Sequence, residues 1–422
     1  MFLAGADGRT PELRPPSIKG AMRFWWRAMN GHLSIKDLKE EEVEIFGGSG
    51  EKEGRSRILL RVKSDNEPER GSNIRNDYNL KWSYNRQENR LDGDDAGIGY
   101  LLYSTVLGGG KYYIKDNQKF TVEIKSQYLD VLKQAVASFW TLAYLGGIGT
   151  RARRGGGNIA ITNIKDGDNL LGEAEPDFLL TGRDCDDVAK WLVHNYNKAK
   201  SVVNKNKRTQ FISEYSNLSI SRFIISNNSF NGWKEALNNI GSEFARFRAD
   251  YKSDIFGTAS FGLPRKHIET SNRDVNRRSS PLIFKILKVG DKYYWLALRL
   301  SGEFLPEDTV LKGRSKLQKP TYDRLDEFWG ILKKKGSERV LSIPDRLNEV
   351  KAKIEKELSP EKMILFGSKA RGDFHKKSDI DIAIETDKSI ELANISGAID
   401  IIKLKKIDKS FKDKIKAEGI EL

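Results

Sequence analysis

The chain has 422 residues, too many for one compact core, so two or three domains are expected. Its 38% hydrophobic content excludes a disordered tail, and the absence of an apolar run of about 18 residues excludes a membrane span. The single cysteine, Cys185, excludes a disulfide framework and a CxxC zinc site, and four scattered histidines do not indicate a metal site. No signal-peptide pattern opens the sequence, so we expect a cytoplasmic protein with no membrane partner.

The net charge of +14 is unevenly distributed along the chain. Residues 345–422 carry 17 basic and 16 acidic side chains, so the first 344 residues hold a surplus of +13. A basic surplus confined to one part of a chain indicates a polyanionic partner for that part. The alternative is a surplus spread evenly over the surface for solubility, and charge alone does not decide between the two.

Residues 13–31 are predicted to form a loop that leads into a helix. Pro15 and Pro16 cannot continue a helix, so the N-cap is expected at Ser17. Apolar side chains that recur at helical spacing are predicted to face a core: Ile18, Met22, Trp25 and Met29. Another face of the same helix carries three cations and an indole: Lys19, Arg23, Arg27 and Trp26.

The middle of the chain predicts two blocks of strands and helices. Strand-like segments are expected at residues 57–62, 120–124, 159–161, 283–287 and 293–298, the last two as a hairpin around Gly290-Asp291. An amphipathic helix is expected from Leu129, and the polar residues 64–99 are expected to form a long loop or insertion. These blocks predict two α+β units, at residues 1–165 and 166–306.

Residues 146–158 form a loop with six glycines and three arginines, namely Arg151, Arg153 and Arg154. Glycines let the backbone approach a ligand closely, and arginine forks grip phosphate, so the loop predicts binding to a nucleic-acid backbone independently of sequence. The sequence contains no Gly-Lys-Ser/Thr motif, so a P-loop is excluded. A helix rather than a strand is expected before Gly147-x-Gly149-x-x-Ala152, so a dinucleotide site is excluded as well. The alternative is a flexible surface turn with incidental arginines.

Three separated motifs together resemble one protein family: residues 11–27, the glycine–arginine loop, and Phe261-Gly-Leu-Pro264 with Arg277-Arg-Ser-Ser-Pro-Leu282. It is the RAMP-superfamily subunit that opens the naming series of the type III-B CRISPR effector, the Cmr complex. The resemblance covers residues 2 to about 306. It implies two ferredoxin-like (RRM-like) units that bind CRISPR RNA beside other Cmr subunits, meet target RNA indirectly and have no established catalytic role.

By this resemblance, six side chains are candidate RNA contacts: Lys19, Arg23, Arg27, Arg151, Arg153 and Arg154. Several residues have a second interpretation. Lys19 and Arg23 could be solvated charges beside a packed helix, and Trp26 could be a stacking platform for a base, whereas Trp25 is expected in the core. Arg277 and Arg278 could equally serve RNA or a neighbouring subunit.

The family usually has an extra strand ahead of the segment that begins at Phe2, and this sequence starts at that point. The first unit is therefore expected to lack an edge strand, unless the start codon lies upstream. Neither outcome changes the candidate RNA contacts.

Residues 307–344 are predicted to be a helical connection, and residues 345–422 a small α/β domain. In this domain Gly367-Ser368 precedes Asp379-Ile-Asp381, and alternate residues of a strand share a face, so the two aspartates are expected to point the same way. Paired carboxylates suit Mg²⁺, and a Gly-Ser turn entering a helix can hold a triphosphate. Asp400 on a neighbouring strand would complete a two-metal site. The alternative is an edge strand with an acidic outer face.

This block resembles the minimal nucleotidyltransferases, a polymerase-β-like fold found as the antitoxin half of HEPN–MNT modules. The resemblance implies that Gly367 and Ser368 bind the phosphates of ATP or another NTP. It also implies that Asp379, Asp381 and Asp400 hold Mg²⁺ and are the catalytic residues. Fourteen residues separate Glu385 from Asp400, fewer than the usual helical insert of that family.

The overall prediction is an α+β chain with two ferredoxin-like RAMP units and a small α/β nucleotidyltransferase-like domain. The first functional hypothesis is a CRISPR RNA-binding subunit of a type III-B Cmr complex that carries this fused domain. The second is a Mg²⁺-dependent nucleotidyltransferase that modifies a protein or RNA partner as its principal activity. A third, an RNA-cleaving RAMP protein, is weaker because neither the glycine–arginine loop nor the Lys19 helix contains a histidine.

Overall fold

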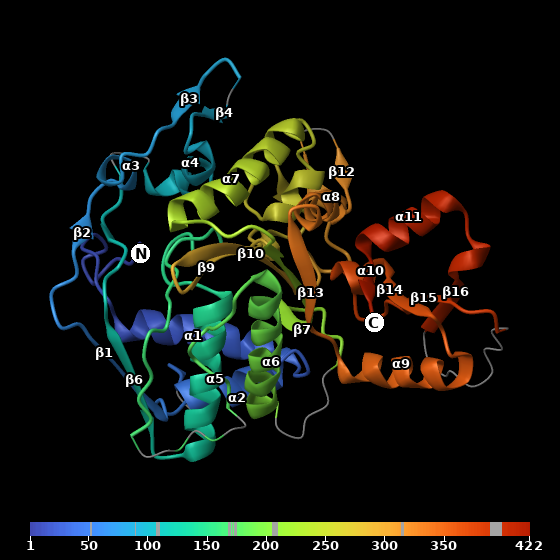
Figure 1. Ribbon diagram of the computed structural model, residues 1–422, viewed down its shortest axis with the longest axis horizontal. Helices are drawn as coiled ribbons and strands as arrows, with labels where there is room; N and C mark the ends of the chain where they lie inside the picture. The colour runs from blue at the N-terminus through green and yellow to red at the C-terminus, as the bar shows by residue number, and fades with distance from the viewer. Residues whose placement is uncertain are drawn as a thin grey trace.

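The computed structural model describes residues 1–422 except 51–52, 89, 107–109, 168–169, 171, 173–174, 205–209, 314–315 and 389–398. Helices and strands alternate along the chain, which confirms the α+β prediction. Figure 1 shows a central sheet between two layers of helices, with a smaller C-terminal domain at one side. Among the described helices, none is both long and apolar enough to cross a bilayer.

The first half of the chain contains α1 (Pro15–Met29), α2 (Ile35–Phe46) and α5 (Leu129–Leu145). The predicted apolar face of α1 is confirmed, because Ile18, Met22, Trp25 and Met29 are at most 3% exposed. The N-cap prediction at Ser17 is wrong: the cap is Arg14, and the prolines occupy the first turn. Proline is tolerated there because the first-turn N–H groups have no intrahelical partner.

Strands in the first half form short antiparallel pairs. β1 (Ile58–Lys63) pairs with β6 (Thr121–Ser126), and β2 (Arg70–Gly71) pairs with β5 (Tyr113–Ile114). Residues 64–99 are expected from the sequence to form a loop or insertion. This region also contains α3 (Ile74–Asp77), β3 (Ser83–Asn85), β4 (Arg90–Asp92) and the start of α4 (Ala96–Leu102). Residues 159–161 are described and are not a strand, so that prediction is wrong. Within its described residues, the first half therefore forms two-stranded sheets rather than the four-stranded sheet of a ferredoxin-like unit.

The second half has a complete ferredoxin-like βαββαβ order. Its elements are β7 (Asn217–Ser226), α7 (Trp233–Asp250), β9 (Leu282–Val289), β10 (Lys292–Ser301), α8 (Asp323–Lys333) and β13 (Gly336–Ser342). The strands lie antiparallel in the order β13-β7-β10-β9. The predicted hairpin is confirmed, with Lys292 opposite Val289 across the Gly290-Asp291 turn.

The position of β13 corrects the prediction that residues 307–344 are a helical connection. β13 pairs with β7 from Gly336 to Ser342 and completes the sheet, while α8 packs in the core beneath it. The strand was missed because its sequence, Gly-Ser-Glu-Arg-Val-Leu-Ser, lacks the apolar alternation that marks a half-buried strand. A separate small sheet consists of the two-residue strands β8 (Glu269–Thr270), β11 (Leu311–Lys312) and β12 (Leu317–Gln318).

Both faces of the four-stranded sheet are covered by helices. One hydrophobic cluster packs Phe223 and Leu296 against α1, α5 and α6 (Cys185–Val203), and a second packs Ile224 and Trp295 against α7 and α8. All ten residues of β7 are consequently buried. RRM domains stack RNA bases on an open sheet face. Since this sheet has no open face, RNA bases cannot stack on it.

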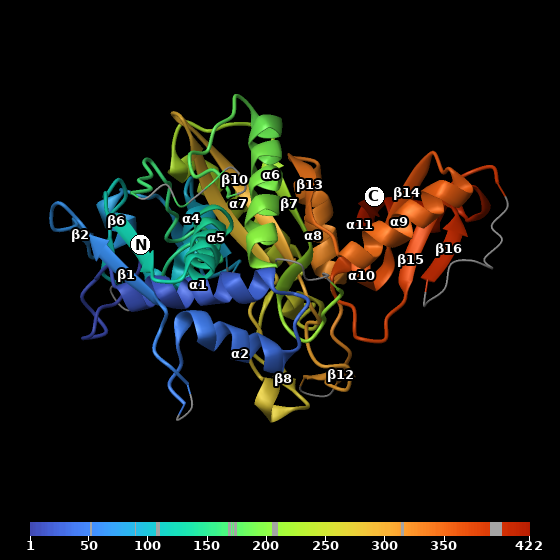
Figure 2. The same cartoon turned by 90° about the horizontal axis from the view of Figure 1, so that it is seen from below.

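The C-terminal domain contains a four-stranded sheet in the order β16-β15-β14-β17. The strands are β14 (Lys362–Phe366), β15 (Ile380–Glu385), β16 (Ile399–Lys403) and β17 (Ile420–Glu421), and the helices are α9 (Asp345–Leu358), α10 (Gly367–Arg371) and α11 (Lys409–Glu418). Figure 2 shows this domain projecting from the end of the molecule. Its core is joined to the rest of the chain, because Ile220 of β7 is 3% exposed in the same cluster as Leu347 and Leu365.

Candidate RNA-binding and nucleotide-binding sites

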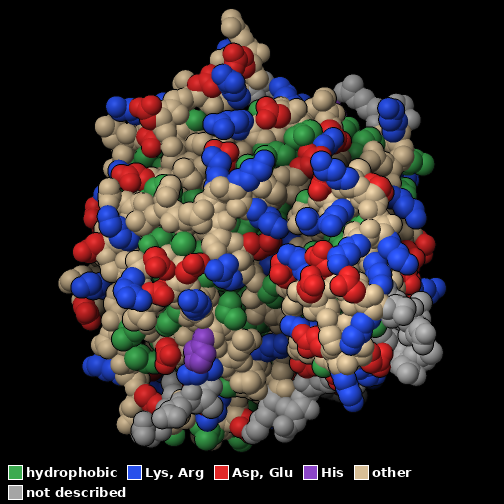
Figure 3. Space-filling view, turned by 45° about the vertical axis from the view of Figure 1, so that its right-hand side comes forward, with side chains coloured by type: hydrophobic (Ala, Val, Ile, Leu, Met, Phe, Trp, Pro, Cys, Tyr) green, Lys and Arg blue, Asp and Glu red, His purple; other side chains and the backbone are tan. Residues whose placement is uncertain are grey.

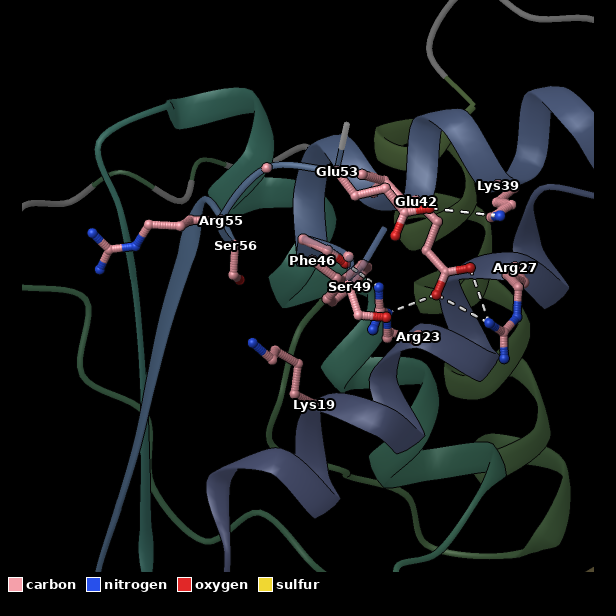
Figure 4. Close-up of a pocket in the computed structure, with 14 residues that line it drawn as sticks. Lys19, Arg23, Arg27, Lys39, Glu42, Phe46, Ser49, Glu53, Arg55 and Ser56 are labelled. Atoms are coloured by element: carbon pink, nitrogen blue, oxygen red, sulfur yellow. Dashed lines mark hydrogen bonds and ion pairs between the residues drawn. The ribbon is translucent and has the colours of Figure 1, made fainter. Parts of the chain in front are cut away.

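An open pocket of about 560 Å³ lies between α1, α2 and the segment that follows α2. We call it the basic groove. Its charged lining consists of five cations and two carboxylates: Lys19, Arg23, Arg27, Lys39, Arg55, Glu42 and Glu53. Figure 4 shows Arg23 and Arg27 pointing toward Glu42 and Lys19 extending nearby from α1, whereas the side chain of Arg55 points away from this group. The structure thus brings together all three predicted RNA contacts of α1.

Glu42 fixes two of the arginines in the groove. Its carboxylate lies 2.7 Å from Nε of Arg23 and 2.9 Å from Nη1 of Arg27, and the residue is only 7% exposed. Arg23 also donates a hydrogen bond to the carbonyl of Gly47. The two guanidinium groups are therefore held in place by one shared carboxylate, and the group of three keeps a net positive charge.

Lys19 and Arg55 are the least neutralised cations of the groove. Neither has an ion-pair partner in the part of the chain that the structure describes, whereas Lys39 lies 3.5 Å from Glu53. Partial burial and the nearby charge of Arg23 lower the pKa of Lys19. An anion placed in the groove would relieve this repulsion.

The groove contains residues that the sequence did not single out, and it excludes one that it did. Glu42, Lys39 and Arg55 become relevant only when α2 and the following segment pack beside α1, and the sequence gives no signal for that packing. Trp26 is fully buried and donates from Nε1 to Oε1 of Gln134 at 3.0 Å. The interpretation of Trp26 as a stacking platform is therefore wrong.

In the glycine–arginine loop, two arginines are engaged with the protein backbone. Arg154 donates from Nη1 to the carbonyl of Leu282 at 2.8 Å and from Nη2 to that of Phe261 at 3.2 Å. Arg153 donates from Nη1 to the carbonyl of Ser280 at 2.7 Å. Burial lowers the pKa of Arg154 to about 9 and that of Arg153 to about 10. These contacts fasten the loop to β9 and the segment before it.

Arg151 differs from its two neighbours. Its guanidinium lies 4.3 Å from the ring centre of Tyr103, and its Nε and Nη2 are buried with no hydrogen-bond partner among the described residues. The backbone around it is tight, because a Cβ at Gly157 would collide with the carbonyl of Ile148. Arg151 thus has two buried guanidinium nitrogens without a partner among the described residues, whereas Arg153 and Arg154 donate to backbone carbonyls.

The two arginines of the third motif, Arg277 and Arg278, also differ in their surroundings. Arg278 donates from Nη2 to the carbonyl of Glu303 at 2.7 Å, while Arg277 is exposed. Figure 3 shows that Lys and Arg side chains on that view of the molecule are spread among Asp and Glu rather than gathered in one patch. On that face, the positive charge is therefore not gathered into one binding surface.

The C-terminal domain brings two of the predicted aspartates side by side. In the parallel pair of β15 and β16, Asp381 lies directly opposite Asp400, so both side chains point to the same face. Asp379 is exposed and immediately precedes β15. Burial, followed by the negative charges of Asp400 and Asp379, raises the pKa of Asp381. Two carboxylates that repel each other in this way suit a hard divalent cation.

The Gly-Ser turn lies against these carboxylates. Gly367 begins α10 with φ +72°, and a Cβ there would collide with Oδ2 of Asp381. Only glycine thus lets the backbone at Gly367 and Ser368 approach the carboxylate. Among the described residues, no three carboxylate, imidazole or thiol groups lie close enough together to hold a metal ion. Asp381 with Asp400 is the pair that the strand register aligns, and Asp379 lies close enough for its charge to act on Asp381.

Comparisons with known proteins give a family match for the N-terminal part of the chain and another for the C-terminal domain. The RAMP superfamily profile matches residues 1–160, and the nucleotidyltransferase domain profile matches residues 347–421. The CRISPR system Cmr subunit Cmr1-1 of Pyrococcus furiosus is 30% identical over 311 residues, which cover 70% of this chain and 83% of that protein. The chain belongs to the Cmr1 family. The resemblance to the RAMP subunit of the type III-B Cmr complex is thereby confirmed, as is the nucleotidyltransferase resemblance of the C-terminal domain.

Two further Cmr1 relatives fit this assignment. Cmr1-2 of the same organism is 29% identical over 189 residues, covering 39% of this chain and 91% of that protein. The crystal structure of Cmr1 from Pyrococcus furiosus in the apo form superposes with a TM-score of 0.51 at 25% identity. That superposition covers 78% of this chain and 92% of the crystallised one.

Proposed function

We propose that this Cmr1-family chain is a CRISPR RNA-binding subunit of a type III-B Cmr complex and that the basic groove holds the RNA backbone. The observation that carries the proposal is that five cations line one groove, and that two of them, Lys19 and Arg55, have no ion-pair partner among the described residues. Contacts to phosphate fix the position of a strand without reading its sequence, which suits a subunit that must accept many guide sequences.

The arrangement of the groove explains how it would bind a strand. Glu42 holds Arg23 and Arg27 in fixed positions, so little side-chain entropy is lost when a phosphate binds. Lys19 and Arg55 supply uncompensated charge, and Arg151 supplies unpaired donors elsewhere on the first half. In this proposal Arg153 and Arg154 support the loop rather than contact RNA. Target RNA is met indirectly, through pairing with the CRISPR RNA, and other Cmr subunits cover the rest of that RNA.

The proposal is tested with the full chain and a labelled CRISPR-type RNA in a gel-shift assay at low salt. The double variant Lys19→Glu/Arg55→Glu should lose most of its RNA affinity. The matched control is Lys353→Glu/Lys356→Glu, which reverses two charges on α9 of the C-terminal domain. If both double variants bind RNA as the unmodified chain does, the groove is not the RNA site.

We also propose, as a second activity, nucleotidyl transfer by the C-terminal domain. The observation that favours it is the register that places Asp381 opposite Asp400, with the backbone of Gly367 against Asp381. Asp381 and Asp400 would hold Mg²⁺, with Asp379 at the rim. The N–H groups of Ser368 and Gly367 would bind the phosphates of ATP or another NTP, and the N–H of Gly367 would exchange its 3.4 Å hydrogen bond to Oε1 of Glu418 for a phosphate oxygen. Bound there, Mg²⁺ would supply neutralisation of the phosphate charge during transfer.

Incubation with ATP labelled on the α-phosphate tests this second activity. Label should appear on a protein or RNA that co-purifies with the chain, and Asp381→Asn should abolish the transfer because one carboxylate of the aligned pair is lost. If no partner becomes labelled and the chain binds no measurable ATP, the proposed activity is rejected.

A further inference from the structure

The segment from Gly367 to His375, which we call the nucleotide loop, is held by residues that precede the C-terminal domain. We call this part of the chain, residues 1–344, the RAMP half. Arg299 of β10 is 2% exposed and donates from Nη2 to the carbonyl of Arg371, while its Nη1 is paired with Asp326 of α8. The N–H of Gly302, just after β10, donates to the carbonyl of Gly372 at 3.0 Å. Two backbone carbonyls of the loop are thus fixed by the RAMP sheet.

The side chains of the loop are also held from the RAMP side. Lys369 is 5% exposed, and its Nζ lies 4.5 Å from the ring centre of Phe211, which precedes β7, and 5.1 Å from that of Phe374. Nδ1 of His375 lies 2.8 Å from Oε2 of Glu303. Contacts therefore reach the loop at its start, middle and end.

The loop depends on the contacts around it to hold this shape, both from its own domain, where Arg371 lies 3.4 Å from Glu418, and from the RAMP half. α10 contains only five residues, and an isolated helix of that length is not stable in water. Gly367 at its start lies against Asp381, so a small shift of the loop changes the distance between the phosphate-binding N–H groups and the carboxylates. The contacts from the RAMP half consequently fix the geometry at which a nucleotide and its cation would be held together.

We infer that Arg299 and Phe211 of the RAMP half are positioning residues of the nucleotide site in the C-terminal domain. The inference rests on the proposed nucleotidyl-transfer function, whose substrate class is a nucleoside triphosphate. It means that the C-terminal domain is not an independent module on a tether. By linkage, nucleotide binding at the loop and the conformation of the RAMP sheet must influence each other to the same extent.

The test measures binding of α,β-methylene-ATP with Mg²⁺ to the full chain by calorimetry, at a temperature where every variant is folded. Arg299→Lys keeps a charge beside Asp326 but loses the second guanidinium nitrogen, which donates to the carbonyl of Arg371. Phe211→Leu keeps an apolar side chain but removes the aromatic ring. Each should weaken binding by at least about fivefold, the low end of coupling between sites. Phe211→Tyr, which keeps the aromatic ring, should bind as the unmodified chain does.

The matched control is Arg248→Lys, because Arg248 also donates to a backbone carbonyl and lies over an aromatic ring, but within the RAMP half alone. It should leave nucleotide affinity unchanged. RNA affinity should be unchanged in all these variants, whereas general loosening of the fold would lower it as well. If the unmodified chain binds the nucleotide and both test variants bind within twofold of it, the inference is overturned while the proposed activity stands. If the unmodified chain does not bind the nucleotide, the proposed activity and the inference fall together.

Discussion

The exchange Arg154→Met separates a supporting role for the glycine–arginine loop from an RNA-binding role. Two hydrogen bonds from a charged donor are lost, each with a contribution of about 1.5–3 kcal/mol. Part of this loss is offset because methionine avoids burying a charge, a cost that is visible in the pKa of Arg154 lowered to about 9. We therefore expect the free energy of unfolding to fall by about 2–4 kcal/mol.

The assay combines thermal unfolding with RNA binding measured below the melting transition of every variant. Arg154→Met should melt several degrees lower and bind RNA with unchanged affinity. Arg151→Met is the matched variant: it should change stability little, because two of its guanidinium nitrogens have no partner among the described residues, and it should weaken RNA binding. An Arg154→Met chain with normal melting and weakened RNA binding would refute the supporting role.

Three further predictions address other parts of the chain. Lys285→Met should raise stability near pH 6 by a few kcal/mol, because full burial lowers the pKa of Lys285 to about 7. Between about pH 7 and 10 the unfolded chain binds a proton that the folded chain lacks, so the unmodified protein should gain stability over this range. A urea-unfolding series with no such gain, or with the same gain in Lys285→Met, would contradict this. Gly367→Ala should abolish binding of α,β-methylene-ATP measured by calorimetry, because the new Cβ collides with Asp381, and normal binding would exclude the close approach. Lys19→Gln/Arg55→Gln should reduce the slope of log K against log salt by about 1.4 and the RNA affinity at 0.1 M salt by roughly 25-fold, and an unchanged slope would show that neither cation contacts phosphate.

The sequence predicts elements whose signal is local. The apolar face of α1, the hairpin around Gly290-Asp291 and the strand that begins beside Asp379 were all predicted, because residue periodicity and turn chemistry are contained within a few residues. The same is true of the three cations of α1, whose spacing alone places them on one side of the helix.

Features that depend on distant partners could not be predicted in the same way. An arginine in a glycine-rich loop has the same local sequence whether it grips a phosphate or a backbone carbonyl, and the partner of Arg154 lies 128 residues away at Leu282. The strand β13 is polar and is defined by pairing with β7, more than a hundred residues earlier in the chain. The shared role of Glu42 likewise arises only from the packing of α2 beside α1.

Photo-crosslinking is the most direct measurement of whether the basic groove holds the guide strand. CRISPR-type RNA that carries 4-thiouridine would be crosslinked to the full chain, and the modified peptides would be identified by mass spectrometry. We predict crosslinks in the peptides that contain Lys19, Arg23, Arg27 and Arg55, all of which line the groove. Crosslinks confined to residues 345–422, with none in the groove peptides, would contradict the proposed RNA-binding role.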